Sequence, residues 1–266
     1  MKTASKLYTT LIFLFLYAPI AVLIVFSFNA SDSTSVFAGF SLKWYGELFR
    51  DRATLEALEN TLLLAVLSSV IATVIGSLAA VGVYRMRSRA LRNSVEMVTN
   101  IPMMNPDIVT GISLMLLFVF VGNLIGAKNS LSFATILIAH VTFSIPYVYL
   151  SVMPKLRQMD RSLPEAAMDL GCTPLQAFFK VELPAILPGI LTGLIMVFTL
   201  SLDDFVISYF TVGSGFETLP IRIYSMTKKR VKPDMYALST LMFLVIFLLL
   251  LLSNLSKREK KQKKQP

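Results

Sequence analysis

The chain has 266 residues, of which 55% are hydrophobic and only 15% are charged, and its mean hydropathy is +0.68. A soluble domain carries roughly 25% charged residues, so one large soluble core is excluded. A net charge of +9 favours contact with nucleic acid or a membrane surface, and the long uncharged runs between the charge clusters decide for the membrane.

Six apolar runs are long enough to cross a bilayer, which takes about 20 helical residues at a rise of about 1.5 Å each. The first run follows Lys2 and Lys6 directly. Because it is long enough to span and no small-residue cleavage site follows it, we interpret it as a retained helix rather than a signal peptide. The predicted spans are residues 7–28, 61–84, 94–122, 130–153, 186–210 and 235–256.

The distribution of lysine and arginine predicts the orientation of these spans. With the N-terminus inside, 16 of the 25 basic residues fall in inner segments and 9 fall in outer segments. The positive-inside rule therefore places both termini in the cytoplasm, although the last outer loop is also basic. The basic tail, residues 257–266, is predicted to be disordered or to lie against anionic lipid headgroups.

The predicted outer segment, residues 29–60, contains the neighbouring aromatic residues Trp44 and Tyr45. Aromatic residues of this kind anchor a chain at the membrane interface. Contact with a partner or a substrate is the alternative, and the sequence leaves both interpretations open.

Cysteine and histidine each occur once, as Cys172 and His140. An intrachain disulfide is therefore excluded, and these two residues alone cannot form a zinc site. The sequence shows no nucleophile–base pair and no metal cluster, so we expect no metal site and no enzyme active site.

The longest predicted inner loop, residues 154–186, carries the start and stop signals of short helices. Ser162 and Glu165 have the spacing of a capping box, in which each side chain bonds the backbone amide of the other. Gly171 then supplies the stop of this first helix.

A second short helix is predicted directly after that stop. Thr173 and Gln176 form another capping box, with Pro174 at the first helical position. Lys180 falls near the end of this helix, and Pro184 is expected to close the unit. The loop is thus predicted to be a rigid helix–turn–helix, and its tether between two spans excludes DNA binding.

The same loop resembles the cytoplasmic signature of the inner-membrane permeases of binding-protein-dependent ABC importers. In that family the segment is the coupling helix, which docks in a cleft of a cytoplasmic ATPase. The chain has no G-x-x-x-x-G-K-[ST] phosphate loop, so the resemblance implies no cofactor bound by this chain and ATP with magnesium at a partner ATPase. The residues that carry the match are Glu165, Ala166, Ala167, Gly171, Val181 (in place of isoleucine), Leu183 and Pro184.

Three carboxylates fall inside the predicted spans, and ionisable groups in a bilayer are candidates for function. Asp107 lies in the third predicted span, and Asp203 and Asp204 lie in the fifth. Helical rise places all three in the outer half of the membrane, where an acidic lining favours a cation. The alternative is a structural polar link between helices.

A wider resemblance, to the spermidine/putrescine permeases of the PotC type, covers nearly the whole chain. It is carried by residues 40–45, 105–109, 199–206 and 219–226. It implies a substrate pathway in which carboxylates hold ammonium groups and aromatic faces hold methylenes and cations. For Ser201, a place at a helix packing surface is an equal alternative. The expected pathway residues are Asp107, Asp203, Asp204, Ser201, Trp44, Tyr45, Tyr147 and Tyr209.

Together these features predict an all-α transmembrane protein with the six-helix type I ABC importer permease fold, also called MetI-like, with residues 1–256 as its permease domain. The resemblance implies a bacterial cytoplasmic membrane and polyamine import by alternating access. It also implies lipid contact without nucleic acid, a second permease of the PotB kind, an ATPase dimer of the PotA kind and an extracytoplasmic binding protein of the PotD kind. A permease of the same fold for another solute, such as iron or thiamine, and an ATP-independent carrier are the alternatives.

Overall fold

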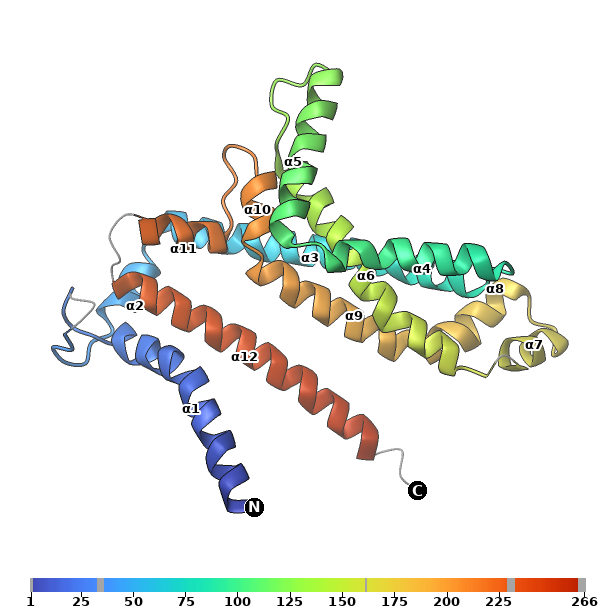
Figure 1. Ribbon diagram of the computed structural model, residues 1–266, viewed down its shortest axis with the longest axis horizontal. Coiled ribbons are helices and arrows are strands. Elements are labelled where there is room, and N and C mark those ends of the chain that lie inside the picture. Colours follow the sequence, from blue (N-terminus) through green and yellow to red (C-terminus); the bar gives the residue numbers. More distant parts are fainter. Residues whose placement is uncertain (1, 33–35, 161, 229–232, 263–266) are drawn as a thin grey trace. The chain divides into compact units, whose positions relative to one another are not determined.

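A computed structural model describes the backbone of residues 2–32, 36–160, 162–228 and 233–262, and side chains between residues 6 and 248 of these ranges. Every regular element of two or more residues in this described part is helical (Figure 1). The elements are α1 (Lys2–Ser27), α2 (Lys43–Leu48), α3 (Arg52–Tyr84), α4 (Arg89–Met104), α5 (Asp107–Leu124), α6 (Phe133–Gln158), α7 (Ser162–Asp169), α8 (Pro174–Ala177), the π-helical turn η1 (Phe178–Glu182), α9 (Leu183–Asp203), α10 (Val206–Thr211), α11 (Leu219–Lys228) and α12 (Pro233–Gln262).

Five helical segments in the described part are long and apolar enough to cross a membrane. They contain α1, α3, α5, α6 and the continuous stretch from α8 to α9, and the described side chains of α12 add a shorter apolar segment, Pro233–Leu248. The prediction of an all-α membrane protein is confirmed. The backbone of α12 continues to Gln262, so the start of the tail predicted to be disordered is helical, whereas residues 263–266 lie outside the described residues.

The third predicted span is not one helix. α4 ends at Met104 and α5 begins at Asp107, with Asn105 and Pro106 in extended conformations between them. The ring of a proline disfavours helical geometry at the residue before it, which favours a break at Asn105. Asp107 therefore lies in the first turn of a helix rather than deep within a span, which corrects the expected position.

The fifth predicted span starts earlier and ends earlier than expected. Pro184 does not close a helix–turn–helix, because residues Pro174–Asp203 form one continuous helical stretch. The turn η1 makes this possible: the Leu183 amide donates to the Phe178 carbonyl five residues back, and such wide turns are π-bulges. At the other end, Asp204 is extended and α10 is a separate short helix.

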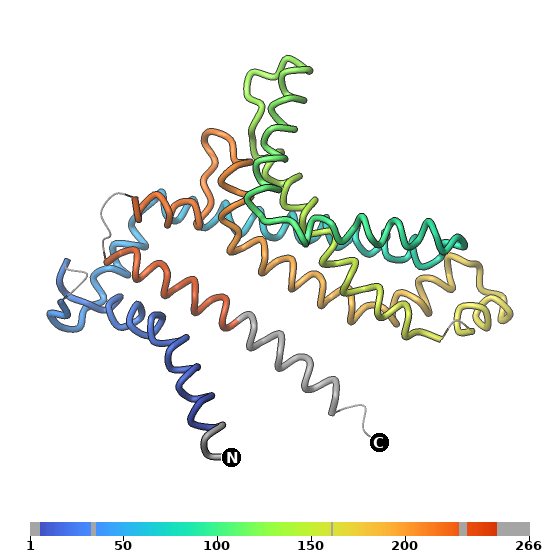
Figure 2. The backbone as a smooth tube through the Cα atoms, viewed as in Figure 1, coloured from blue at the N-terminus to red at the C-terminus, as the bar shows by residue number. Residues whose placement is uncertain are grey.

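The chain divides into two compact units, one built from residues 1–58 and 221–266 and one from residues 59–220 (Figure 2). In the second unit, α6 packs along α9 where glycines allow close approach. A Cβ atom on Gly189 would lie 2.8 Å from the Ser151 carbonyl oxygen, and one on Gly193 would lie 3.2 Å from the Val148 Cα. Small residues at such contacts are what membrane helices use to pack closely.

The first unit pairs α1 with α12 and packs α2 against α12. Within it, the indole of Trp44 is only 4% exposed, and its Nε1–H donates to the Asn29 carbonyl at 2.6 Å. The Tyr45 hydroxyl shares a 2.8 Å hydrogen bond with the Ser27 hydroxyl. These contacts tie α2 to the segment that follows α1.

Candidate functional site

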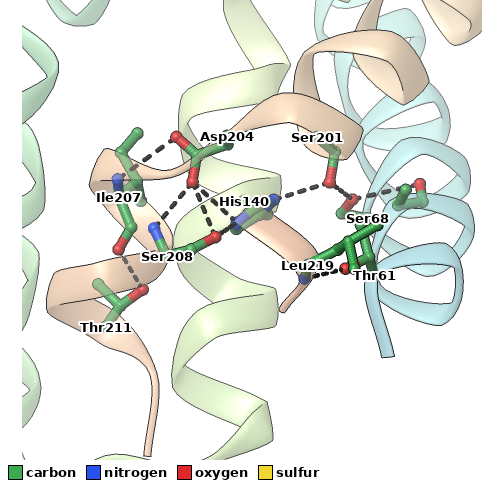
Figure 3. Close-up of polar contacts among 10 residues, drawn as sticks. Thr61, Ser68, His140, Ser201, Asp204, Ile207, Ser208, Thr211 and Leu219 are labelled. Atoms are coloured by element: carbon green, nitrogen blue, oxygen red, sulfur yellow. Dashed lines mark hydrogen bonds and ion pairs between the residues drawn. The ribbon is translucent and has the colours of Figure 1, made fainter. Parts of the chain in front are cut away.

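The break between α9 and α10 is built around a buried polar network (Figure 3). His140 of α6 is fully buried, and its Nδ1 lies 2.7 Å from the Ser201 hydroxyl of α9. Its Nε2 lies 2.9 Å from the Ser208 hydroxyl of α10 and 3.4 Å from a carboxylate oxygen of Asp204. The Ser201 hydroxyl is also 3.0 Å from that of Ser68 on α3. Four helical elements therefore meet in one hydrogen-bonded chain.

Asp204 is held on its other side by the start of α10. Its carboxylate accepts hydrogen bonds from the Ser208 amide and hydroxyl, both at 2.8 Å, and from the Ile207 amide at 3.3 Å. Only 10% of its side chain is exposed. A carboxylate at a helix start satisfies amides that have no partner within the helix, so Asp204 serves as the link between helices that the sequence left as its alternative role.

The other two predicted carboxylates are placed differently, because both Asp107 and Asp203 are exposed on the surface of this chain. Asp107 is in the first turn of α5, and α5 packs against α10. At that contact, one turn after Asp107, a Cβ atom on Gly111 would lie 3.5 Å from the Ile207 Cα. The fold thus brings the start of α5 to the helix that follows the Asp203–Asp204 pair.

Aromatic side chains lie beside this break. The ring of Tyr209, which is 44% exposed, lies 5.4 Å from the ring of Phe205 and 5.6 Å from that of Phe210. Tyr147, another predicted pathway residue, is half-buried against the core of α3, α6 and α9. Of the predicted aromatic residues in the second unit, Tyr209 is the one that the fold places next to the carboxylates.

Trp44 and Tyr45 belong to the first unit, where their polar atoms bond the chain itself. The ammonium group of Lys43 lies 4.6 Å from the centre of the Trp44 ring, so that ring already has a cation beside it. A substrate could reach the buried indole only if these contacts opened.

The predicted coupling segment forms the surface of α7, α8 and η1. Gly171 ends α7 with φ +89°, and the Cys172 amide donates to the Ala167 carbonyl at 3.0 Å, which is the helix stop that the sequence predicted. The Thr173–Gln176 capping box is confirmed. Glu165 and Ala166 of α7 are exposed, and Leu170, directly after α7, is 87% exposed, so this segment presents residues suited to a partner.

The first predicted capping box is replaced by another arrangement. Ser162 is the first residue of α7, and its amide and hydroxyl donate to the Asp160 carboxylate at 3.0 and 2.9 Å. These two hydrogen bonds, the backbone one foremost, lower the pKa of Asp160. Asp160, rather than Glu165, bonds Ser162 because Asp160 lies just before the helix and its short side chain reaches the first free amides.

A charged pair that sequence reasoning did not predict joins the end of α3 to the coupling segment. Arg85 donates to the Glu182 carboxylate at 2.7 Å, and only 8% of the Glu182 side chain is exposed. Both line a cavity of about 310 Å³ that also touches Glu165. Leu183 packs against the core beside them, and Pro184 is exposed at the start of α9.

Sequence reasoning also missed His140, Ser68 and Ser208. His140 was weighed only as a zinc ligand, for which it has no companion, and the two serines are ordinary residues of apolar helices. The usable signal was that a lone histidine in an apolar span needs polar partners when it is buried.

Comparison with known proteins places this geometry in a family. Residues 72–258 match the family model described as "binding-protein-dependent transport system inner membrane component". The chain is 44% identical to the putrescine transport system permease protein PotI of Escherichia coli K12, with 86% of this chain and 82% of that protein aligned. It is 40% identical to the spermidine/putrescine transport system permease protein PotC of the same strain, with 90% and 88% aligned.

Solved structures share the fold. A chain of a bacterial ABC transporter that imports the acidic polysaccharide alginate superposes with a TM-score of 0.76 at 18% identity, covering 97% of this chain and 95% of that chain. A chain of the MetNI methionine ABC transporter superposes with a TM-score of 0.62 at 20% identity, covering 83% and 99%. The predicted type I importer fold is confirmed, and the chain belongs to the binding-protein-dependent transport system inner membrane components, the permease subunits of ABC importers.

Proposed function

We propose that the chain is the permease subunit of an ATP-driven importer of polyamines, putrescine or spermidine, in a bacterial cytoplasmic membrane. The observation that carries this proposal is the identity of 40–44% with PotC and PotI over more than four fifths of each protein. The alginate and methionine transporters, at 18–20% identity, share the fold alone.

The exposed carboxylates supply chemistry suited to such a solute. Polyamines are flexible chains with ammonium groups separated by methylenes. Asp107 and Asp203 offer two acceptors for ammonium groups, and the exposed face of Tyr209 offers cation–π and methylene contact. Two weak contacts on neighbouring elements suit a transporter, because a tight site would trap the solute.

The energy for transport comes from a separate ATPase, which docks on α7. The exposed surface of Glu165, Ala166 and Leu170 suits insertion into a groove of a partner. The lysine and arginine bias puts this surface and both termini in the cytoplasm. The complete assembly contains a second permease, two ATPases and an extracytoplasmic binding protein, and it works by alternating access.

The test is ATP-dependent uptake of radiolabelled putrescine and spermidine into vesicles that hold the chain with its neighbouring permease, ATPase and binding protein. We expect uptake that needs ATP and is lost on Glu165→Lys. Asp107→Asn and Asp203→Asn are expected to lower it by at least about tenfold each, the worth of one hydrogen bond to a charged group. Glu56→Gln, an exposed carboxylate on α3, is the matched control.

Absence of uptake for both polyamines, with the ATPase still stimulated by a binding protein loaded with another solute, would keep the importer and overturn the substrate. Transport that continues without ATP, or without the ATPase subunit, would overturn the importer as well.

A further inference from the structure

The two adjacent aspartates of the α9–α10 break have opposite surroundings, since Asp203 is exposed and Asp204 is 10% exposed and hydrogen-bonded. We propose that they divide the work: Asp203 faces the solute, and Asp204 with His140 is a positioning pair that holds the break open and so aims Asp203. The part that concerns the solute rests on the proposed function.

The local sequence does not explain why the helix ends here. Residues 201–211 contain neither glycine nor proline, and the apolar pattern predicted a fifth span that continues to residue 210. Yet Asp204 is extended, with φ −65° and ψ 120°. Because no backbone breaker is present, side-chain contacts must stabilise the broken form.

Asp204 caps the start of α10, and the contacts that join the two sides of the break come from α6. The buried imidazole of His140 lies between Ser201, before the break, and Ser208, after it, at 2.7 and 2.9 Å. One rigid ring therefore sets the spacing between the end of α9 and the first turn of α10. A continuous helix would move Ser201 and Ser208 away from the two ring nitrogens.

Donor and acceptor accounting assigns a proton to one nitrogen. The Ser208 hydroxyl donates to Asp204, so it has no proton left for His140. An unprotonated Nε2 would place a lone pair against the Ser208 oxygen and 3.4 Å from the Asp204 carboxylate. Nε2 must therefore carry a proton and donate to this pair. Asp204 is then a nearly buried acceptor with protein donors at both oxygens, and Asp203 is the exposed carboxylate of the two.

The position of Asp203 follows from this arrangement. It is the last residue of α9, directly before the bonded Asp204. If the break closed, Asp203 would become an interior helical residue, and its carboxylate would lose the direction that the extended Asp204 gives it. The same network fixes the start of α10 and so the ring of Tyr209.

The first experiment compares substitutions in the complete transporter, reading polyamine uptake and thermal stability of the purified complex. Asp203→Asn is expected to lower uptake at least about tenfold with stability unchanged. Asp204→Asn and His140→Leu are expected to lower both. His140→Gln, whose amide N–H can occupy the position of Nε2, should restore more of both than His140→Asn, which replaces only the Nδ1 side.

Equal effects of Asp203→Asn and Asp204→Asn on uptake and on stability would overturn the division of work. Equal loss in His140→Leu and His140→Gln would overturn the role of Nε2.

A second experiment needs no solute. The single cysteine is replaced by Cys172→Ser, and Asp203→Cys is labelled with a cationic methanethiosulfonate in the detergent-solubilised complex, with Glu56→Cys at an exposed position of α3 as control. We expect ready labelling at position 203 that slows when His140→Leu is added, and an unchanged rate at position 56.

The two experiments separate the two ideas. Slowed labelling at position 203, combined with no polyamine uptake by the unmodified complex, would leave the positioning pair standing and remove the proposed substrate. Uptake that is intact, combined with a labelling rate at position 203 that ignores His140→Leu, would remove the positioning pair and leave the substrate.

Discussion

Two of the predicted spans, residues 94–122 and 186–210, are interrupted by a helix break next to a carboxylate, and the two breaks are held in different ways. Between α4 and α5 the backbone favours the break, because Pro106 disfavours helical geometry at Asn105 and the Val109 amide donates to the Pro106 carbonyl at 2.9 Å. Between α9 and α10 no such residue is present, and His140, Ser208 and Asp204 hold the chain open through side chains.

The difference shows that carboxylates within apolar runs of one membrane protein can have different roles. Asp107 follows a break that exists without it, so its charge is available. Asp204 is part of the break, so its carboxylate already accepts hydrogen bonds from the amides of α10 and lies beside the His140 imidazole. Position in an apolar run marks both residues as unusual, but the neighbouring contacts decide which of them can meet a solute.

The largest expected effect is on Asp204 itself. Asp204→Ala should destabilise the folded protein by about 3–5 kcal/mol, because it leaves the buried His140 and the first amides of α10 without an acceptor. Asp107→Ala should cost no more than about 1 kcal/mol, the worth of one charge at a helix start. Denaturant unfolding of the purified complex measures both, and equal losses would erase the difference between the two breaks.

The contact between α5 and α10 ties the breaks together through Gly111. A Cβ atom there would lie 3.0 Å from the Phe210 ring, so Gly111→Val should destabilise the protein by about 1–3 kcal/mol. Gly82→Val on α3, where a Cβ atom meets no other atom within 4 Å, is the matched control and should not destabilise. Unfolding midpoints decide, and a harmless Gly111→Val would mean that the two breaks do not touch closely.

Pro106→Ala should have a smaller effect than either. Proline restricts the unfolded chain at a position whose native φ of −58° it fits, so the substitution should cost about 0.4–1 kcal/mol. Pro106→Gly should cost more, because glycine is freer still in the unfolded chain. The same unfolding measurement applies, and a loss as large as that of Asp204→Ala would show that the backbone break is not independent of other contacts.

Asp51 is a carboxylate outside the apolar spans that also accepts hydrogen bonds at the start of a helix. Its substitution has the smallest expected effect on stability. Burial raises the pKa of Asp51, but hydrogen bonds from Thr54 and Arg222 outweigh it, so the pKa lies below its usual value. A lowered folded pKa means that this stabilisation is present above the unfolded pKa of about 3.9 and is lost as the pH falls through the folded pKa.

Asp51→Asn should therefore cost at most about 1 kcal/mol near pH 7, given that the pair is partly exposed. At a pH below the folded pKa of Asp51, the variant and the unmodified protein should be equally stable. Unfolding at neutral and acidic pH checks this, and a difference that persists in acid would point to lost packing rather than lost charge.

Much of the fold was predictable from the sequence, because long apolar runs and short basic segments are read directly from composition. The break at Asn105 was predictable too, because an asparagine followed by proline is a turn signal. The single span predicted at residues 94–122 did not take this signal into account. Pro184 was the opposite case. It was expected to end a helix, but the π-helical turn η1 directly before α9 allows the helical stretch to continue through it.

The positioning network was beyond local sequence reasoning. His140 meets Ser201 and Ser208 from 61 and 68 residues away, and Ser201 meets Ser68 from 133 residues away. No periodicity or motif links such positions. The same holds for Arg85 and Glu182, 97 residues apart, although Glu182 lies between two residues of the family signature.

The continuous stretch from Pro174 to Asp203 has a mechanical consequence. Thirty helical residues make a rod of about 45 Å, with the turn that follows α7 at one end and the acidic break at the other. Tilting such a rod by about 5° about the end next to α7 would displace the other end by about 4 Å. Under the proposed docking of an ATPase on α7, a small rotation at that end would therefore become a displacement larger than a hydrogen bond at Asp203.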